Sequence, residues 1–255
     1  MLSIEENRFE QVIGMQGQHD YRDVIAPHTH LRAQLLYPTE GTLRVHTAKH
    51  VWIVSPHSAL WIPAGVEHSA VALSQVKLST ALVDPDSAYA LGPDCILIKM
   101  TDLLTALIIR INQMQSSGFD NRNYALELIK SIQFLILDEI HQALSLPVEL
   151  PWPTDSRLVG ICEALLSQPQ QRKDLTVWAD HIGTSPRTLM RLFQKQTGLT
   201  YRAWIQHMHI ALALAKLARG ESVARLATAL GYTSPSAFSA MFKRHMGQTP
   251  QQFRR

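Results

Sequence analysis

Two short stretches of the sequence concentrate histidines, which are common transition-metal ligands in proteins. The first reads Pro27-His28-Thr29-His30, and the second runs from Pro63 to a further histidine, His68. In an extended strand alternate side chains point the same way, so His28 and His30 would share one face. Neutral imidazoles suit zinc, iron, nickel or copper. These histidines therefore indicate a site that binds a metal or a small molecule.

The segments around these histidines are short, alternating and β-branched from Phe9 to Asp84. Their regular spacing favours an antiparallel sandwich or barrel. We expect strands at residues 31–37, 41–46, 50–54, 60–63 and 76–83. From Asp102 the apolar period becomes helical, which predicts helices from Asp102 to about Gln115 and from about Asn121 to Leu144.

The two histidine stretches resemble the paired motifs of cupins, which are small antiparallel jelly-roll barrels. In that family the matching histidines and a glutamate converge on a divalent metal inside the barrel. His28, His30 and His68 occupy those positions here, and Gln34 replaces the glutamate. The resemblance therefore implies a divalent transition metal held by these four residues. An amide is a weaker, uncharged ligand, so the alternative is that they act as interior polar groups or effector contacts without a metal.

A barrel mouth lined by apolar, aromatic and histidine side chains predicts a small-molecule pocket. We expect an effector there to contact His28, His30, Gln34, Trp52, Trp61 and His68. Either tryptophan could equally belong to the plain core.

The second predicted helix carries an apolar stripe that includes Leu126, Ile129, Ile136 and Ile140. We expect this stripe to form part of a homodimer seam. The alternative is that it packs entirely on its own barrel.

Charge and proline content divide the chain. Residues 1–154 hold 10 Lys/Arg and 16 Asp/Glu (net −6), whereas residues 155–255 hold 14 and 5 (net +9). Three prolines between Leu146 and Pro153 exclude a helix interior or a central strand there. We therefore expect an effector-binding and dimerisation domain at 1–145, a linker at 146–155 and a second domain at 156–255. The basic half suggests a polyanionic partner, unless it is simply a solvated helical surface.

The basic half contains an internal repeat. Ala179, Ile182 and Gly183 correspond to Ala227, Leu230 and Gly231, 48 residues later. Ser185-Pro186 recurs 49 residues later as Ser234-Pro235. In each copy a glycine permits the turn after a short helix, and Ser-Pro begins the next helix. Two copies of this unit in a basic half predict a pair of DNA-binding helix-turn-helix motifs.

Residues 157–254 resemble the AraC/XylS family of transcription regulators. The match is dense in the second copy, at Val223, Leu226, Ala227, Leu230, Gly231-Tyr232, Ser234, Ser236-Ala237-Phe238, Phe242-Lys243-Arg244, Gly247, Thr249-Pro250 and Phe253-Arg254. The family implies seven helices, with a long helix from Tyr201 to about Ala218 joining two helix-turn-helix units. It also implies double-stranded promoter DNA and RNA polymerase as partners, and an activator.

The side of each recognition helix on which a residue lies predicts whether it contacts the DNA or packs in the domain. In the first, from Pro186 to Gln196, we expect base contacts from Arg187, Met190, Arg191 and Gln194, and phosphate contacts from Thr188 and Lys195. In the second, the equivalent surface carries Ser234, Ser236, Ser239, Ala240, Lys243 and Arg244, and we expect it mainly to position the protein on the DNA backbone. Any one of these charges could instead be a solvated surface group. His209 stands where family members often have an arginine, which can serve a structural or a phosphate contact. A histidine there suggests weaker or pH-sensitive DNA binding.

The sequence therefore predicts an α+β regulator with a cupin-like jelly-roll sensor domain and an all-α DNA-binding domain. Its first ten residues show no basic segment followed by an apolar one, and Cys95 and Cys162 lie far apart, so we expect a cytoplasmic protein. Two alternatives remain open. One is a metal-dependent cupin enzyme fused to a DNA-binding domain, and the other is a regulator that needs no effector.

Overall fold

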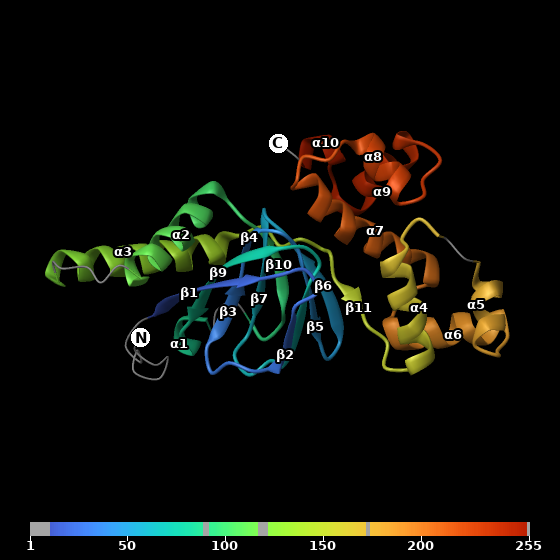
Figure 1. Ribbon diagram of the computed structural model, residues 1–255, viewed down its shortest axis with the longest axis horizontal. Helices are drawn as coiled ribbons and strands as arrows, with labels where there is room; N and C mark the ends of the chain where they lie inside the picture. The colour runs from blue at the N-terminus through green and yellow to red at the C-terminus, as the bar shows by residue number, and fades with distance from the viewer. Residues whose placement is uncertain (1–10, 89–91, 117–121, 172–173, 254–255) are drawn as a thin grey trace. The chain divides into compact units, whose positions relative to one another are not determined.

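The computed structural model describes residues 11–88, 92–116, 122–171 and 174–253 (Figure 1). Internal contacts divide the chain into two units, one of residues 1–45 and 54–146 and the other of residues 46–53 and 147–255. Within the described ranges, no helix has both the length and the apolar character of a membrane span.

The strands form two antiparallel sheets. One has the order β1-β9-β3-β7-β10, with β4 also paired to β9, and the other has the order β11-β6-β5-β8-β2. Their bounds are β1 Val12–His19, β2 Val24–His28, β3 Ala33–Leu36, β4 Pro38–Glu40, β5 Leu43–Thr47, β6 His50–Val54, β7 Ser58–Ile62, β8 His68–Ala72, β9 Val76–Val83, β10 Ile96–Lys99 and β11 Leu150–Pro151. This arrangement confirms the predicted antiparallel sandwich.

The strands predicted at His50–Val54 and Val76–Val83 form with those bounds, as β6 and β9. The structure differs at the first histidine stretch, where β2 ends at His28 and the register shifts between Ile25 and His28. His30 therefore lies in the loop that follows β2. Alternation along a strand does not explain why His28 and His30 come together.

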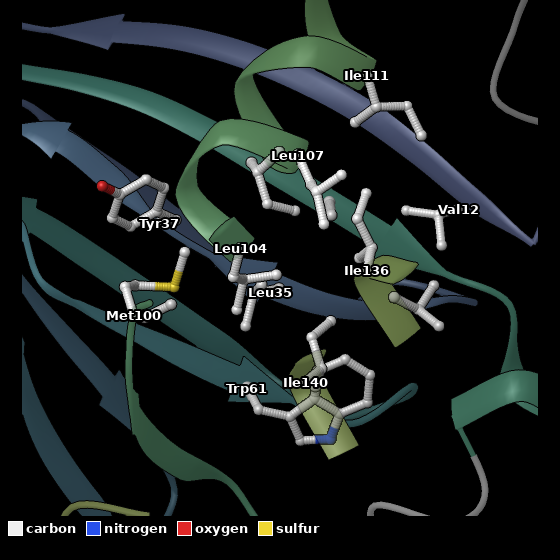
Figure 2. Close-up of a cluster of buried hydrophobic side chains, with 14 of the residues drawn as sticks. Val12, Leu35, Tyr37, Trp61, Met100, Leu104, Leu107, Ile111, Ile136 and Ile140 are labelled. Atoms are coloured by element: carbon white, nitrogen blue, oxygen red, sulfur yellow. The ribbon is translucent and has the colours of Figure 1, made fainter. Parts of the chain in front are cut away.

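Two helices follow the strands of the first unit, α2 (Asp102–Ser116) and α3 (Arg122–Gln142), after the one-turn helix α1 (Pro85–Ala88). Both long helices lie beside the sheet that contains β1 and β9 (Figure 1). The break predicted between them, at Ser116–Gly118, falls mostly outside the described residues. Apolar side chains of both helices pack on this sheet in one cluster, which includes Leu104, Ile111, Ile136 and Ile140 (Figure 2).

This cluster corrects half of the predicted dimer seam. Ile136 and Ile140 are buried in their own unit, and Figure 2 shows Ile140 beside Trp61. The alternative, that the stripe packs on its own sheet, is therefore right for these two residues. Leu126 is exposed and Ile129 is partly buried.

Buried amides tie the same two helices to strand backbones. Gln133 Nε2 of α3 donates to Val12 O (2.9 Å), and Gly14 N of β1 donates to Gln115 Oε1 of α2 (2.6 Å). Asn112 Nδ2 donates to Ser79 Oγ of β9 (3.1 Å). Since buried polar groups need partners, these bonds fix the helices in one position on β1 and β9.

The second unit contains the proline-rich segment and, in its described part, seven helices. The short strand β11 pairs with Val51 and His50 at the edge of a sheet, where prolines are tolerated. The helices are α4 Ser156–Ser167, α5 Leu175–His181, α6 Pro186–Thr197, α7 Tyr201–Leu217, α8 Val223–Ala229, α9 Pro235–Met246 and α10 Pro250–Phe253. The predicted long joining helix is α7.

Candidate effector pocket and DNA interface

A cavity of about 230 Å³ lies inside the sandwich, between strands of both sheets. Its lining comes from β1, β2, β3, β8 and β9 and the loop after β2. The residues are Met15, Gln16, Gly17, His19, Ile25, His28, His30, Gln34, Leu36, His68, Leu78 and Thr80. This volume is at the small end for ligand pockets, so it fits a compact molecule.

Three histidines meet at this cavity, as the sequence predicts. The ring centroids of His28 and His68 are 4.4 Å apart, and that of His30 lies 4.8 Å from His28 and 5.3 Å from His68. One ring nitrogen from each lies within 4.8 Å of the other two. The backbone brings them together, because His28 pairs with His68 between β2 and β8 and Gly65 N donates to His30 O (2.9 Å).

Two of the rings are oriented by backbone carbonyls. His28 Nδ1 lies 2.8 Å from Ala26 O, and His68 Nδ1 lies 2.9 Å from Val66 O. A carbonyl can only accept, so each Nδ1 carries the proton in these bonds. In the neutral ring, Nε2 then keeps its lone pair.

The cluster favours neutral imidazoles. Burial lowers the pKa of His30, and the nearby His28 and His68 lower it further, while the Gln34 side chain partly offsets this. Burial also lowers the pKa of His68, against the opposing effect of its bond to Val66 O. At neutral pH both rings therefore present lone pairs rather than positive charge.

Three lining residues carry buried polar atoms that lack a hydrogen-bond partner within the described part of the chain. They are His30 Nε2, Gln34 Oε1 and Thr80 Oγ1. An unsatisfied buried polar atom costs about 1–3 kcal/mol. Three such atoms around one cavity indicate that a ligand or water completes them.

The predicted tryptophans do not line this cavity, which corrects the expectation for both. Trp61 lies on the opposite face of its sheet, in the cluster under α2 and α3 (Figure 2). Trp52 is buried on β6 and is likewise absent from the lining. Nearly every residue of β6 and β7 is buried, so alternation cannot tell the pocket face from the other face.

Sequence reasoning missed the lining that β1 and β9 supply. The signal was present in β9, where Leu78 and Thr80 point into the cavity and the intervening Ser79 bonds to Asn112. In a strand that is buried on both faces, the alternation of side chains does not show which of the two alternating groups of residues faces a ligand.

The repeated units of the second domain fold alike. Ser185 Oγ accepts from Thr188 N at the start of α6, and Ser234 Oγ accepts from Ala237 N at the start of α9 (both 3.2 Å). Gly183 and Gly231 have φ values of 68° and 71° in the two turns. Each pair of helices, α5–α6 and α8–α9, is therefore a helix-turn-helix.

The surface of α6 is open to solvent at the positions expected to contact DNA. The side chains on it that we expect to contact bases or phosphates are all exposed, namely Arg187, Thr188, Met190, Arg191, Gln194 and Lys195. Leu189 and Phe193 are buried on the opposite face. Gln196, which the sequence left without a role, accepts from Thr154 N and Asp155 N (2.8 and 2.9 Å).

Of the predicted contacts on α9, Ser236, Ala240, Lys243 and Arg244 are exposed, and Ser239 is partly buried. Ser234 caps the helix through its hydroxyl, so its first role is structural. The two cationic side chains lie in the last turns of α9 rather than at its start.

His209 has the structural role of the two that the sequence left open, and a phosphate contact is wrong. It is 0% exposed in α7. Its Nδ1 lies 3.1 Å from Tyr232 Oη, and its Nε2 lies 3.1 Å from Pro169 O. The imidazole therefore joins the segment after α4 to the turn of the second helix-turn-helix, and cannot reach DNA from there.

Comparisons with known proteins match the two halves of the chain to two different families. Residues 13–91 match the family described as "AraC-like ligand binding domain", and residues 178–255 match "Helix-turn-helix domain". The chain is 30% identical over 226 residues to the HTH-type transcriptional regulator NimR of Escherichia coli (strain K12), covering 89% of this chain and 81% of that protein.

It is also 23% identical over 207 residues to the arabinose operon regulatory protein of the same strain, covering 80% of this chain and 63% of that protein. The crystal structure of ToxT from Vibrio cholerae O395 aligns with a TM-score of 0.39 at 14% identity, over 96% of this chain and 97% of that one.

The NimR match spans both halves of the chain and is to a transcriptional regulator rather than an enzyme, which favours the regulator over the alternative of a metal-dependent cupin enzyme. Both halves of the chain match domains of one kind of regulator, and the NimR match spans both. The chain therefore belongs to the AraC family of DNA-binding transcriptional regulators, with a ligand-binding domain ahead of its helix-turn-helix domain.

Proposed function

We propose that a small-molecule effector binds in the 230 Å³ cavity and thereby controls promoter binding, with transcriptional activation as the outcome. The observation that carries this proposal is the set of three buried, unsatisfied polar atoms, on His30, Gln34 and Thr80, inside an otherwise largely apolar cavity. A compact effector with a few polar atoms would satisfy them.

The route from the cavity to the helices runs through two strands. Thr80 faces the cavity, and its neighbour Ser79 accepts from Asn112 Nδ2 of α2. On β1, Gly17 lines the cavity and Gly14 N bonds to Gln115 of α2. A ligand that shifts β1 or β9 therefore biases the position of α2, which is the differential contact that a population shift needs.

The exposed apolar face of α3 supports a homodimer with a seam different from the one that the sequence predicts. Phe134 is 69% exposed, and Leu126, two helical turns before it on the same side of α3, is 51% exposed. Leu135 is 41% exposed and lies on the side of the helix opposite Leu126. Exposed apolar side chains on one helix mark an interface, and a second copy of the chain offers the same surface in return. The proposed seam is therefore centred on Phe134, with Leu126 beside it and with Ile136 and Ile140 buried in the core.

In the DNA-binding domain, α6 supplies most base contacts, through Arg187 and Arg191, which lie one turn apart and are both exposed. The α9 surface, with Lys243 and Arg244, contacts the DNA backbone. RNA polymerase is the further partner that activation requires.

The experiment is a thermal-unfolding screen of the full chain against a panel of small metabolites. A Leu78→Trp variant fills the cavity, and Leu73→Trp, at an exposed leucine outside the lining, is the matched control. Compounds that raise the unfolding temperature of the wild type and of Leu73→Trp should leave Leu78→Trp unchanged. Equal stabilisation of Leu78→Trp would place the effector outside this cavity.

A further inference from the structure

We infer that the effector is a neutral molecule that binds His28, His68 and Gln34 directly, by donating hydrogen bonds to them from N–H or O–H groups on a compact apolar body. The inference rests on the proposed function, because it names the chemical class of ligand that the same cavity takes. A primary amide is the simplest head group of this class.

The polar side of the cavity offers mainly hydrogen-bond acceptors. The Nδ1 atoms of His28 and His68 face backbone carbonyl oxygens at 2.8 and 2.9 Å, so in the neutral rings each Nε2 can only accept. Gln34 Oε1 is a third acceptor, and it is buried without a hydrogen-bond partner within the described part of the chain. The ligand must therefore supply donors. His30 Nε2 and Thr80 Oγ1 do not alter this, because a hydroxyl donates or accepts and the His30 ring has two tautomers.

These acceptors lie close enough together for one head group to meet them. The ring centroids of His28 and His68 are 4.4 Å apart. Gln34 lies near the same cluster, since its side chain acts to raise the pKa of His30, whose ring centroid is 4.8 Å from that of His28. A primary amide nitrogen carries two N–H donors and can therefore bond to two of the acceptors at once.

The charge of the lining disfavours both ionised kinds of ligand. Among the described residues that line the cavity, none is Lys, Arg, Asp or Glu. An anion would bring further acceptors to a surface of acceptors, with no cation to pair with it. A cation would bring donors, but no carboxylate would balance its charge in a largely apolar cavity. A neutral donor satisfies the acceptors without burying a charge.

The same charge pattern disfavours the metal that the cupin resemblance implies. That family has a glutamate where this chain has Gln34, so here no lining carboxylate would offset the charge of a dication. An unbalanced buried charge is costly. The histidine lone pairs therefore serve the effector itself.

The remaining walls of the cavity define the body of the ligand. Ile25, Leu36 and Leu78 are apolar, and the volume is about 230 Å³. A pocket of this kind binds a compact apolar body and uses its few polar groups to orient the ligand.

Four probes of nearly the same shape test the inference on the full chain, purified without an affinity tag and kept in a chelator. Benzamide is neutral and has two N–H donors, whereas acetophenone is neutral and has none. Benzoate is an anion without donors, and benzamidinium is a cation with donors. In ligand-observed NMR titrations, benzamide should bind at least about tenfold more tightly than each of the other three. This ranking is measured on the wild type, so it does not depend on the folding of any variant.

Substitutions at Gln34 should change the ranking in opposite ways. Gln34→Leu removes one acceptor, so it should weaken benzamide binding by at least about threefold and leave acetophenone binding unchanged. Gln34→Glu adds a carboxylate, so benzamidinium should become the tightest of the four probes. Gln113→Leu and Gln113→Glu, at an exposed glutamine of α2 outside the lining, are the matched controls and should bind all four probes as the wild type does.

Several results would overturn the inference. Acetophenone or benzoate binding as tightly as benzamide would remove the need for donors, and equally tight benzamidinium binding would remove the need for neutrality. A wild type that binds no benzamide at millimolar concentration, or that keeps one transition-metal ion per chain in the chelator, would also contradict it.

Leu78→Trp separates this failure from failure of the proposed function. If benzoate bound the wild type more tightly than benzamide but did not bind Leu78→Trp, the effector cavity would stand and the neutral donor would be wrong. Benzamide binding that persisted in Leu78→Trp would place the probe outside the cavity and contradict both proposals.

Discussion

The backbone carbonyl oxygen of Gln170 lies 2.7 Å from the position that a β-carbon on Gly231 would occupy. Gly231 ends the first helix of the second helix-turn-helix, with φ of 71°. Its counterpart in the first unit, Gly183, has φ of 68° but open space around the same position. Both glycines therefore need a left-handed backbone conformation, but only Gly231 also has no room for a β-carbon.

This difference predicts unequal costs for the same substitution. Gly183→Ala should lower the free energy of unfolding by about 1–2 kcal/mol, the cost of a left-handed conformation for a residue with a β-carbon. Gly231→Ala should cost about 1–3 kcal/mol more, because the Gln170 backbone must move. Urea unfolding of the two variants measures the difference. Equal costs would mean that the Gln170 contact is relieved without strain.

The exposed arginine Arg191 should read sequence. Arg191→Ala should cost about 1–3 kcal/mol at the preferred operator and relax the preference at one base pair. Lys243→Ala on α9 should weaken binding to all sequences alike and reduce its dependence on salt. Selection of binding sites from random DNA, followed by titration at two salt concentrations, gives both quantities. A uniform loss in Arg191→Ala would make it a phosphate contact.

The α3 face should control assembly. Phe134→Glu places a charge at the centre of the proposed seam, and it should produce monomers without unfolding because Phe134 is 69% exposed. Leu73→Glu is the control, at an exposed leucine outside α3. Sedimentation velocity distinguishes the two species. A dimer that persists in Phe134→Glu would place the interface elsewhere.

Alkaline pH should destabilise the second domain through Tyr201. Burial raises the pKa of Tyr201 to about 12, against the opposing effect of the hydrogen bond from Trp178 Nε1 (2.9 Å). The unfolded chain loses this proton near pH 10, so between pH 10 and 12 the unfolded state binds fewer protons and stability falls as pH rises.

Tyr201→Phe should lessen that fall, although it also removes a hydrogen bond and lowers stability at pH 7. Tyr21→Phe, at a tyrosine that is 59% exposed, should leave the fall intact. Urea midpoints measured from pH 8 to 11.5 test this. An equal decline in wild type and Tyr201→Phe would show that other groups cause it.

Residues that act on their own neighbours in the chain, such as helix caps, turn glycines and prolines, predicted the local parts of the fold correctly. Ser-Pro caps and turn glycines set both helix-turn-helix units, and the proline-rich run marked a segment that is neither helix nor central strand. The three histidines were also predicted as a cluster. They come together through the pairing of His28 with His68 and the bond to His30 O, rather than through alternation along a single strand.

The errors in the first domain share one physical cause, which is burial on two faces. Trp61 and Ile136 belong to a core between a sheet and its covering helices, and their patterns resemble those of pocket and interface residues. His209 was misjudged because its burial depends on Tyr232 and on Pro169, 40 residues away in the sequence. Sequence alone does not show which apolar face meets solvent, a ligand or another helix.

The most direct measurement is the affinity of the full chain for its selected operator, with and without a compound that stabilises the wild type but not Leu78→Trp. Coupling of the usual size should change the dissociation constant by at least about fivefold in the wild type. It should leave Leu78→Trp unaffected. An unchanged dissociation constant in the wild type, with the compound bound, would contradict effector control and identify a regulator that binds DNA independently of its cavity.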